Sequence, residues 1–254
     1  MFDRPTYKAA ARAQLRGKWA FPVVMTLIVS VLMTMLGLLT KGTRTYTATA
    51  GAVYVLHQAN ALTVLIIGIG GILALAQTHV YLKLARTGEK ATFDDFLHGL
   101  SDWLAGALGG LWFALWTFLW SLLFVIPGIV KMFSYSQMFF VLAENPGIGV
   151  RKAMDISKII TRGHKGELFA MTLSFFGWAL LCALPCIISL WAANVLPAFP
   201  RQISVVLLNV GLLWLKPYMR ASFLNAYFAL KNTAIATNLL SPADFAPAAQ
   251  GEKQ

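Results

Sequence analysis

Five apolar runs limit this chain to a membrane protein. Each is long enough, or nearly so, to cross a hydrocarbon layer, which takes about 20 helical residues. Charged residues make up only 12% of the chain, against roughly a quarter in soluble domains, so a soluble domain is excluded. Membrane barrels alternate apolar and polar residues and these runs do not, so the spans are helices. The runs are residues 21–39, 61–82, 105–130, 168–190 and 203–215.

The third run, residues 105–130, is too long for one straight crossing. At 1.5 Å per residue it would reach about 39 Å, against a hydrocarbon core of about 30 Å. Pro127 lacks an amide donor and Gly128 tolerates the dihedral angles of a reversal, so we predict a turn at this pair. Residues 128–144 then form a further crossing, and the chain has six spans.

Loop charges support six spans, because short cytoplasmic loops carry an excess of Lys and Arg. With six spans, only Lys41, Arg44 and Arg201 lie outside, with Lys131 beside the outer turn. We therefore predict a multi-pass protein of the cytoplasmic membrane with both termini in the cytoplasm. The amino terminus and two loops then carry the inner charges, namely Arg4, Lys8, Arg12, Arg16 and Lys18, then Lys83, Arg86 and Lys90, then Arg151, Lys152, Lys158, Arg162 and Lys165.

The predicted fold is an all-α polytopic membrane bundle of about six transmembrane helices with short interfacial amphipathic helices. Residues 1–240 are expected to form a single integral membrane domain, and residues 241–254 a polar, disordered cytoplasmic tail. One amphipathic helix is expected in the loop that follows Glu144. Another is expected to begin at Thr92, where Asp95 stands at the position that completes a capping box.

A resemblance to a known family is densest over residues 122–181. Its marks are the Pro-Gly turn, a Tyr-Ser pair, an Ala-Glu exit from the fourth span, Ser-Lys and Gly-His-Lys loop positions, and LSFFGW in the fifth span. In these features the chain resembles a family of bacterial multi-pass membrane proteins known only as domain of unknown function nine-seven-five. The resemblance implies a polytopic cytoplasmic-membrane fold and no established activity.

Motifs for catalysis, a cofactor or a metal are lacking in the sequence, so we expect no enzymatic activity and no cofactor. Asp94, Asp95 and His98 lie within one helical turn and could ligate a metal, but a helix cap and an interfacial histidine explain them better. Cys182 and Cys186 stand within an apolar span, where packing is a better explanation than zinc binding.

Three basic residues stand within or beside the predicted spans. A cation near the bilayer centre costs about 2.5–3.5 kcal/mol on insertion scales, so such residues are functional candidates. Lys131 can extend to the outer surface, whereas Lys216 and Arg220 lie four residues apart on one helical face, around Pro217. Two interpretations stay open. Arg220 forms a structural ion pair with Glu144, or the two cations bind a lipid phosphate or an anionic solute.

Two functions follow from these features. The leading prediction is a non-enzymatic membrane protein that organises lipids or partner proteins, since its polar residues gather at the interfaces. The alternative is a small transporter or permease-like component that binds an anionic solute or lipid phosphate near Lys216 and Arg220. A closed apolar bundle would favour the first, and a polar cavity at the bilayer midplane the second.

Membrane lipids are the expected partners. Arg151, Lys152 and Lys158 are candidate contacts for anionic headgroups, in addition to the two cations within the span. A protein partner or a homo-oligomer is left open. Nucleic acid is not expected, because the basic residues flank spans instead of forming a patch on a soluble domain.

Overall fold

The helices of this protein extend from a common base. The structure, a computed structural model, describes residues 2–39, 43–47, 53–57, 61–195 and 202–246. The predicted all-α fold is confirmed, apart from a short antiparallel hairpin, β1–β2, between α2 and α3. In chain order the elements are α1 (Arg4–Leu15), α2 (Ala20–Leu39), β1 (Thr43–Thr47), β2 (Val53–His57), α3 (Ala61–Thr87), α4 (Phe93–Leu100), α5 (Trp103–Leu123), α6 (Val125–Tyr135), α7 (Met138–Glu144), α8 (Val150–Ile160), α9 (Lys165–Val195), α10 (Gln202–Ala236) and the 3₁₀ helix η1 (Pro242–Phe245).

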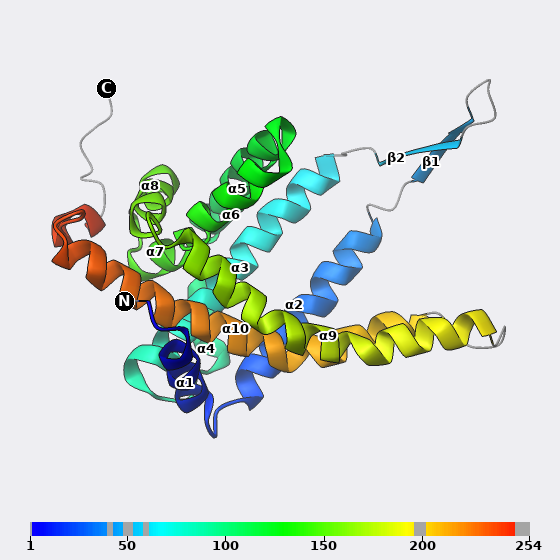
Figure 1. Cartoon of the computed structure of the whole chain (residues 1–254), viewed down its shortest axis with the longest axis horizontal. Helices are drawn as coiled ribbons and strands as arrows, with labels where there is room; N and C mark the ends of the chain where they lie inside the picture. The colour runs from blue at the N-terminus through cyan, green and yellow to red at the C-terminus, as the bar shows by residue number, and fades with distance from the viewer. Residues whose placement is uncertain (1, 40–42, 48–52, 58–60, 196–201, 247–254) are drawn as a thin grey trace.

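The apolar runs form three helical hairpins, α2 with α3, α5 with α6, and α9 with α10. They diverge from the base, which also holds α1, α4, α7, α8 and η1 (Figure 1). The sixth predicted span, residues 203–215, lies in α10, whose side chains are described from Val210 onward. Within the described residues five segments are long and apolar enough to cross a membrane, namely Ala20–Gly37, Ala61–Thr87, Trp103–Leu123, Val125–Glu144 and Lys165–Ser189.

The break predicted in the third run is present, but at Phe124 instead of Pro127. Phe124 adopts extended backbone between α5 and α6, with φ −159° and ψ 147°. Pro127 stands in the first turn of α6, where a helix has no acceptor for its missing N–H. Gly128 serves a close contact, because a Cβ there would lie 2.9 Å from the Cα of Ser121 on α5.

Glycines bring α3 and α5 into backbone contact. Gly71 of α3 faces Gly106 and Gly110 of α5, and a Cβ on Gly71 would overlap the Gly106 carbonyl and lie 2.8 Å from the Gly110 Cα. Small residues allow helices in membranes to approach this closely. The second hairpin is therefore held against the first by backbone surfaces.

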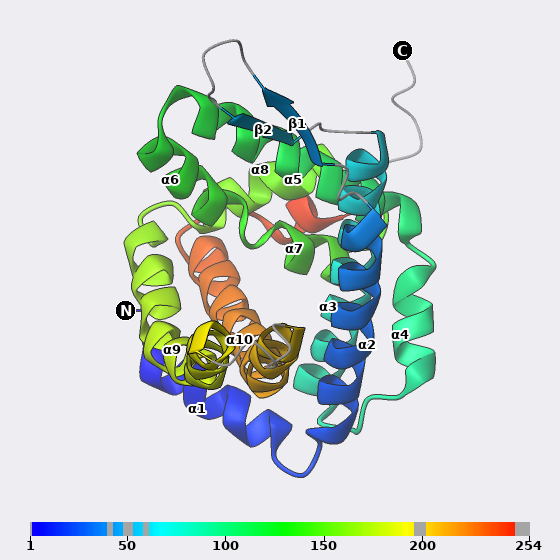
Figure 2. The ribbon, with the colours of Figure 1, turned by 90° about the vertical axis from the view of Figure 1, so that its right-hand side faces the viewer.

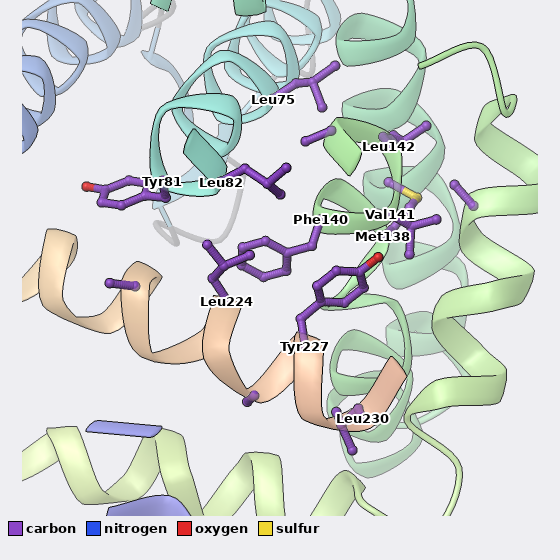
Figure 3. Close-up of a cluster of buried hydrophobic side chains, with 14 of the residues drawn as sticks. Leu75, Tyr81, Leu82, Met138, Phe140, Val141, Leu142, Leu224, Tyr227 and Leu230 are labelled. Carbon is purple, nitrogen blue, oxygen red and sulfur yellow. The ribbon is translucent and has the colours of Figure 1, made fainter. Parts of the chain in front are cut away.

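The main buried core lies at the base, where α7 packs between α3 and α10 (Figure 3). Phe140 of α7 stacks on Tyr227 of α10, with ring centroids 5.6 Å apart. A short helix thus joins two long ones into one packed unit. The buried side chains here include Leu75, Tyr81, Leu82, Met138, Val141, Leu142, Leu224 and Leu230.

Helix α1 was not predicted. Ala11 and Leu15 are fully buried, although four basic residues surround them in the sequence. The side chain of Gln14 on α1 forms two hydrogen bonds with that of Asn225 on α10, at 3.0 and 2.9 Å. The amino-terminal segment is therefore part of the base and not a charged tail.

The amphipathic helix predicted after Glu144 is present as α8. A side chain of α8 also stabilises a break in the fourth span. That span is divided into α6 and α7 at Gln137. The Ser157 hydroxyl donates to the Ser134 carbonyl at 2.8 Å and accepts from the Gln137 N–H at 3.2 Å. Because Ser157 is fully buried, water cannot replace these bonds.

We expect Ser157→Ala to lower the free energy of unfolding by about 1–3 kcal/mol, since it leaves buried backbone groups with fewer partners. Thermal unfolding in mild detergent measures the change. Thr233→Ala is the control, because the Thr233 hydroxyl also donates to a carbonyl, but to that of Ala229 within α10 and on an exposed surface. Equal shifts in both variants would contradict a structural role for Ser157 at the break.

Helix α4 begins at the predicted capping box. The Asp95 carboxylate accepts from the Thr92 N–H at 2.7 Å, and Lys83 of α3 donates to it at 2.7 Å. Partial burial alone would raise the pKa of Asp95, but the bonds from Lys83 and Thr92 outweigh it and lower the pKa. His98 is exposed, and no three His, Cys, Asp or Glu side chains of the described residues gather as a metal site.

The tail predicted to be disordered is folded over residues 241–246. Phe245 of η1 is buried, with the Lys231 Nζ 4.4 Å from the centre of its ring. Lys152 of α8 donates to the Ala246 carbonyl at 3.2 Å. The rest of that segment, residues 247–254, lies outside the described residues, so the division at residue 240 stays a prediction.

Candidate functional site

A cavity of about 730 Å³ lies among the diverging helices, chiefly α2, α3, α6, α7 and α10. In Figure 2, α2 lies on the right of the molecule and α6 at the upper left. The wall is mostly apolar, but both cations predicted from the sequence, Lys216 and Arg220, line it. The neutral polar side chains on the wall are Thr26, Ser30, Thr34, Gln77, Thr78, Ser136 and Thr172.

Both cations bind to points halfway along neighbouring helices. The Lys216 Nζ donates to the Ser30 Oγ at 3.2 Å, and Ser30 stands in the middle of α2. The Arg220 Nη1 donates to the Ala74 carbonyl at 3.2 Å, and Ala74 stands in the middle of α3. Both helices are long and apolar enough to cross a membrane, so we expect the two charged groups near mid-depth.

Neither cation has a carboxylate partner among the described residues. Six ion pairs are present there, and none of them involves Lys216 or Arg220. No Asp or Glu is among the residues described on the cavity wall. An uncompensated charge in a low-dielectric site is unfavourable, so two of them one helical turn apart favour occupation by an anion.

Comparison with known proteins places these helices in a family. Residues 111–234 match the family described as "Protein of unknown function (DUF975)". This stretch is similar to the DUF975 domain. The resemblance drawn from the sequence is thereby confirmed, and α6 to α9 with most of α5 and α10 lie in the matched stretch. No curated protein and no solved structure matches the chain significantly.

The matched stretch holds both cavity cations, but α2 and α3 supply their partners. Ser30 and Ala74 stand before residue 111, where the family match begins. The cavity is therefore completed by the amino-terminal hairpin. Sequence reasoning missed Ser30 and Gln77, although a polar side chain in the middle of an apolar run is a recognisable signal.

The predicted ion pair between Glu144 and Arg220 is wrong. Glu144, at the carboxyl end of α7, pairs with Arg86 of α3 and with the Lys231 Nζ at 2.7 Å. It also accepts from the Tyr227 hydroxyl at 2.5 Å. Helix α10 continues well past the predicted end of the span at residue 215. It thereby brings Lys231, about three helical turns beyond Arg220, to Glu144.

Pro217 does not interrupt α10. The helix runs through it to Ala236, so the exposed backbone expected at an interrupted span is not found there. Pro217 still removes one backbone donor between the two cations, which leaves the carbonyl one turn earlier without its usual helical bond. The cavity chemistry therefore comes from side chains.

The other predicted cation contacts lie away from the cavity. Arg151 is exposed on α8, and Lys158 on the same helix pairs with Asp155 at 2.8 Å. Lys152 binds the Ala246 carbonyl as described above. Lys131 of α6 places its Nζ 4.3 Å from the centre of the Trp120 ring. Contact of the α8 residues with anionic headgroups stays a prediction.

Proposed function

We propose that this protein is an integral protein of the cytoplasmic membrane that binds an anionic group inside the bilayer, in the cavity between α2, α3 and α10. One observation carries the proposal. Lys216 and Arg220 share a cavity in which no carboxylate is described. Each charge costs about 2.5–3.5 kcal/mol near mid-depth. The described protein contacts of the two residues, one hydroxyl and one carbonyl, are neutral and offset little of that cost.

The two cations on the cavity wall favour a transporter or permease-like component over a scaffold, although the rest of the wall is mostly apolar. A protein that only organised lipids or partners would be served by a closed apolar bundle, whereas a binding site for cargo needs space at mid-depth. The basic residues of α1 and α8 at the base support a cytoplasmic position for that end, and with it cytoplasmic termini. A homo-oligomer or protein partner is compatible with this proposal and is not required by it.

Removal of either cation tests the proposal. Arg220→Gln and Lys216→Gln are each expected to weaken binding of phosphatidylglycerol or of glycerol 3-phosphate about tenfold, since a hydrogen bond to a charged group contributes about 1.5–3 kcal/mol. Native mass spectrometry of gently extracted protein measures retained lipid, and calorimetry measures the soluble phosphate. Lys131→Gln is the control, because Lys131 is a cation in the stretch that matches the family, but it lies outside the cavity.

The outcomes are distinct. Loss of binding of either probe in the cavity variants, with binding retained in Lys131→Gln, supports an intramembrane anion site. Binding of both probes that is unchanged in Arg220→Gln and Lys216→Gln overturns it. Thermal unfolding of each variant shows whether the fold is intact, and Gln retains a hydrogen-bond donor for the Ser30 and Ala74 contacts.

A further inference from the structure

The exposed part of the cavity wall comes from two helices that face each other. Thr34 of α2 and Met132 of α6 line the cavity and are exposed, whereas the other described lining residues are half-buried or buried. These two helices stand on opposite sides of the molecule in Figure 2. The mouth of the cavity therefore lies between α2 and α6.

Both rim residues belong to membrane-spanning segments. Thr34 lies within Ala20–Gly37, and Met132 lies within Val125–Glu144. Neither stands in a loop, and segments of this length and apolarity place both residues at hydrocarbon depth, which favours an opening sideways into the bilayer. A ligand that arrives through it has to dissolve in the bilayer first.

The lining combines two kinds of side chain. Lys216 and Arg220 supply its cations, and Ser30 and Gln77 are among its neutral polar residues, with Gln77 only 5% exposed. Aromatic and thioether side chains cover much of the remaining wall, and they include Phe133, Phe139, Phe140, Phe223, Met33 and Met219. A cavity of about 730 Å³ is in the range of sites for ligands of considerable size, and a bare phosphate would leave most of this apolar wall empty.

We infer that the ligand is a phospholipid with a net negative headgroup, which enters sideways between α2 and α6 with its phosphate on Lys216 and Arg220 and an acyl chain along the aromatic wall. This inference rests on the proposed anion site. It adds the source of the phosphate and the route. The shared chemistry, a phosphate ester, could also come from a water-soluble metabolite, and the experiment separates the two.

Photochemical crosslinking in vesicles tests the route. A benzoylphenylalanine is placed at Met132 on the rim, and as a control at Phe176, which lies on α9 with 61% of its surface exposed and is not among the lining residues. The vesicles contain equal amounts of phosphatidylcholine and phosphatidylglycerol. At Met132 we expect phosphatidylglycerol adducts to exceed phosphatidylcholine adducts about tenfold, because both lipids carry a phosphate but only phosphatidylglycerol offers Lys216 and Arg220 a net negative charge. At Phe176 the adducts should follow the bulk composition.

Three further arms decide between explanations. Arg220→Gln should abolish the headgroup preference at Met132 and leave the adducts at Phe176 unchanged. Thr34→Trp, which narrows the mouth without touching the cations, should reduce Met132 adducts several-fold at an unchanged unfolding temperature. An excess of glycerol 3-phosphate should not displace the lipid.

The result that overturns the inference differs from the one that overturns the anion site. If glycerol 3-phosphate removes the Met132 preference, or binds the detergent-extracted protein as tightly as the lipid does, the ligand is water-soluble while the anion site stands. Adducts at Met132 that follow the bulk composition overturn the lateral lipid route. If Arg220→Gln changes the binding of neither the lipid nor glycerol 3-phosphate, both proposals are overturned.

Discussion

Replacing Glu144 with Gln is expected to lower the free energy of unfolding by about 3 kcal/mol, because it removes the charge of a buried carboxylate from its half-buried partner Lys231. Glu144 is 8% exposed at its side chain, and Lys231, its partner on α10, is 18% exposed. The same carboxylate binds Arg86 of α3 and the Tyr227 hydroxyl. One substitution therefore weakens the junction of α3, α7 and α10.

Asp155→Asn is the matched control for this prediction. Asp155 and Lys158 form an ion pair of similar length, 2.8 Å, but their side chains are 54% and 42% exposed. An exposed pair contributes about 0–1 kcal/mol. Chemical or thermal unfolding in one detergent compares the two variants. A loss in Glu144→Gln no larger than in Asp155→Asn would show that the junction does not depend on this charge cluster.

Gly71→Ala is expected to destabilise the protein by about 3 kcal/mol, the upper end of what overpacking costs, because the added methyl meets backbone and not a movable side chain. It would overlap the Gly106 carbonyl and lie 2.8 Å from the Gly110 Cα. Separation of α3 from α5 is the only way to accommodate it. The same unfolding measurement applies.

Gly177→Ala is the control, and it is expected to raise the free energy of unfolding. Gly177 stands within α9, and a Cβ there would meet no atom within 4 Å. Alanine in place of glycine within a helix then gains about 1 kcal/mol from propensity. Destabilisation by both substitutions would mean that the glycines serve something other than the contact between α3 and α5.

Length and hydropathy predict most of this fold. The over-long third run requires a break, and the break occurs within three residues of the predicted pair. The short helices at Thr92 and after Glu144 follow from capping and periodicity. Helix α1 escaped prediction because its buried residues, Ala11 and Leu15, are few among charged neighbours.

The candidate site was predictable only in part. Lys216 and Arg220 are recognisable as cations in an apolar run, since insertion energy alone marks them. Their surroundings depend on the register between helices, which hydropathy does not determine. Glu144 therefore pairs three turns away from the predicted partner, and the cavity itself arises from the divergence of hairpins that share no sequence pattern.

Because the hairpins diverge, the two ends of the long helices are expected to differ in local stability. The fully buried side chains gather at the base, whereas Leu122, Phe124 and Ile126 at the end of one hairpin are each more than 70% exposed to their surroundings. Amide hydrogen exchange should therefore be slowest in α7 and the adjoining turns of α3 and α10, and faster toward the far ends of the hairpins.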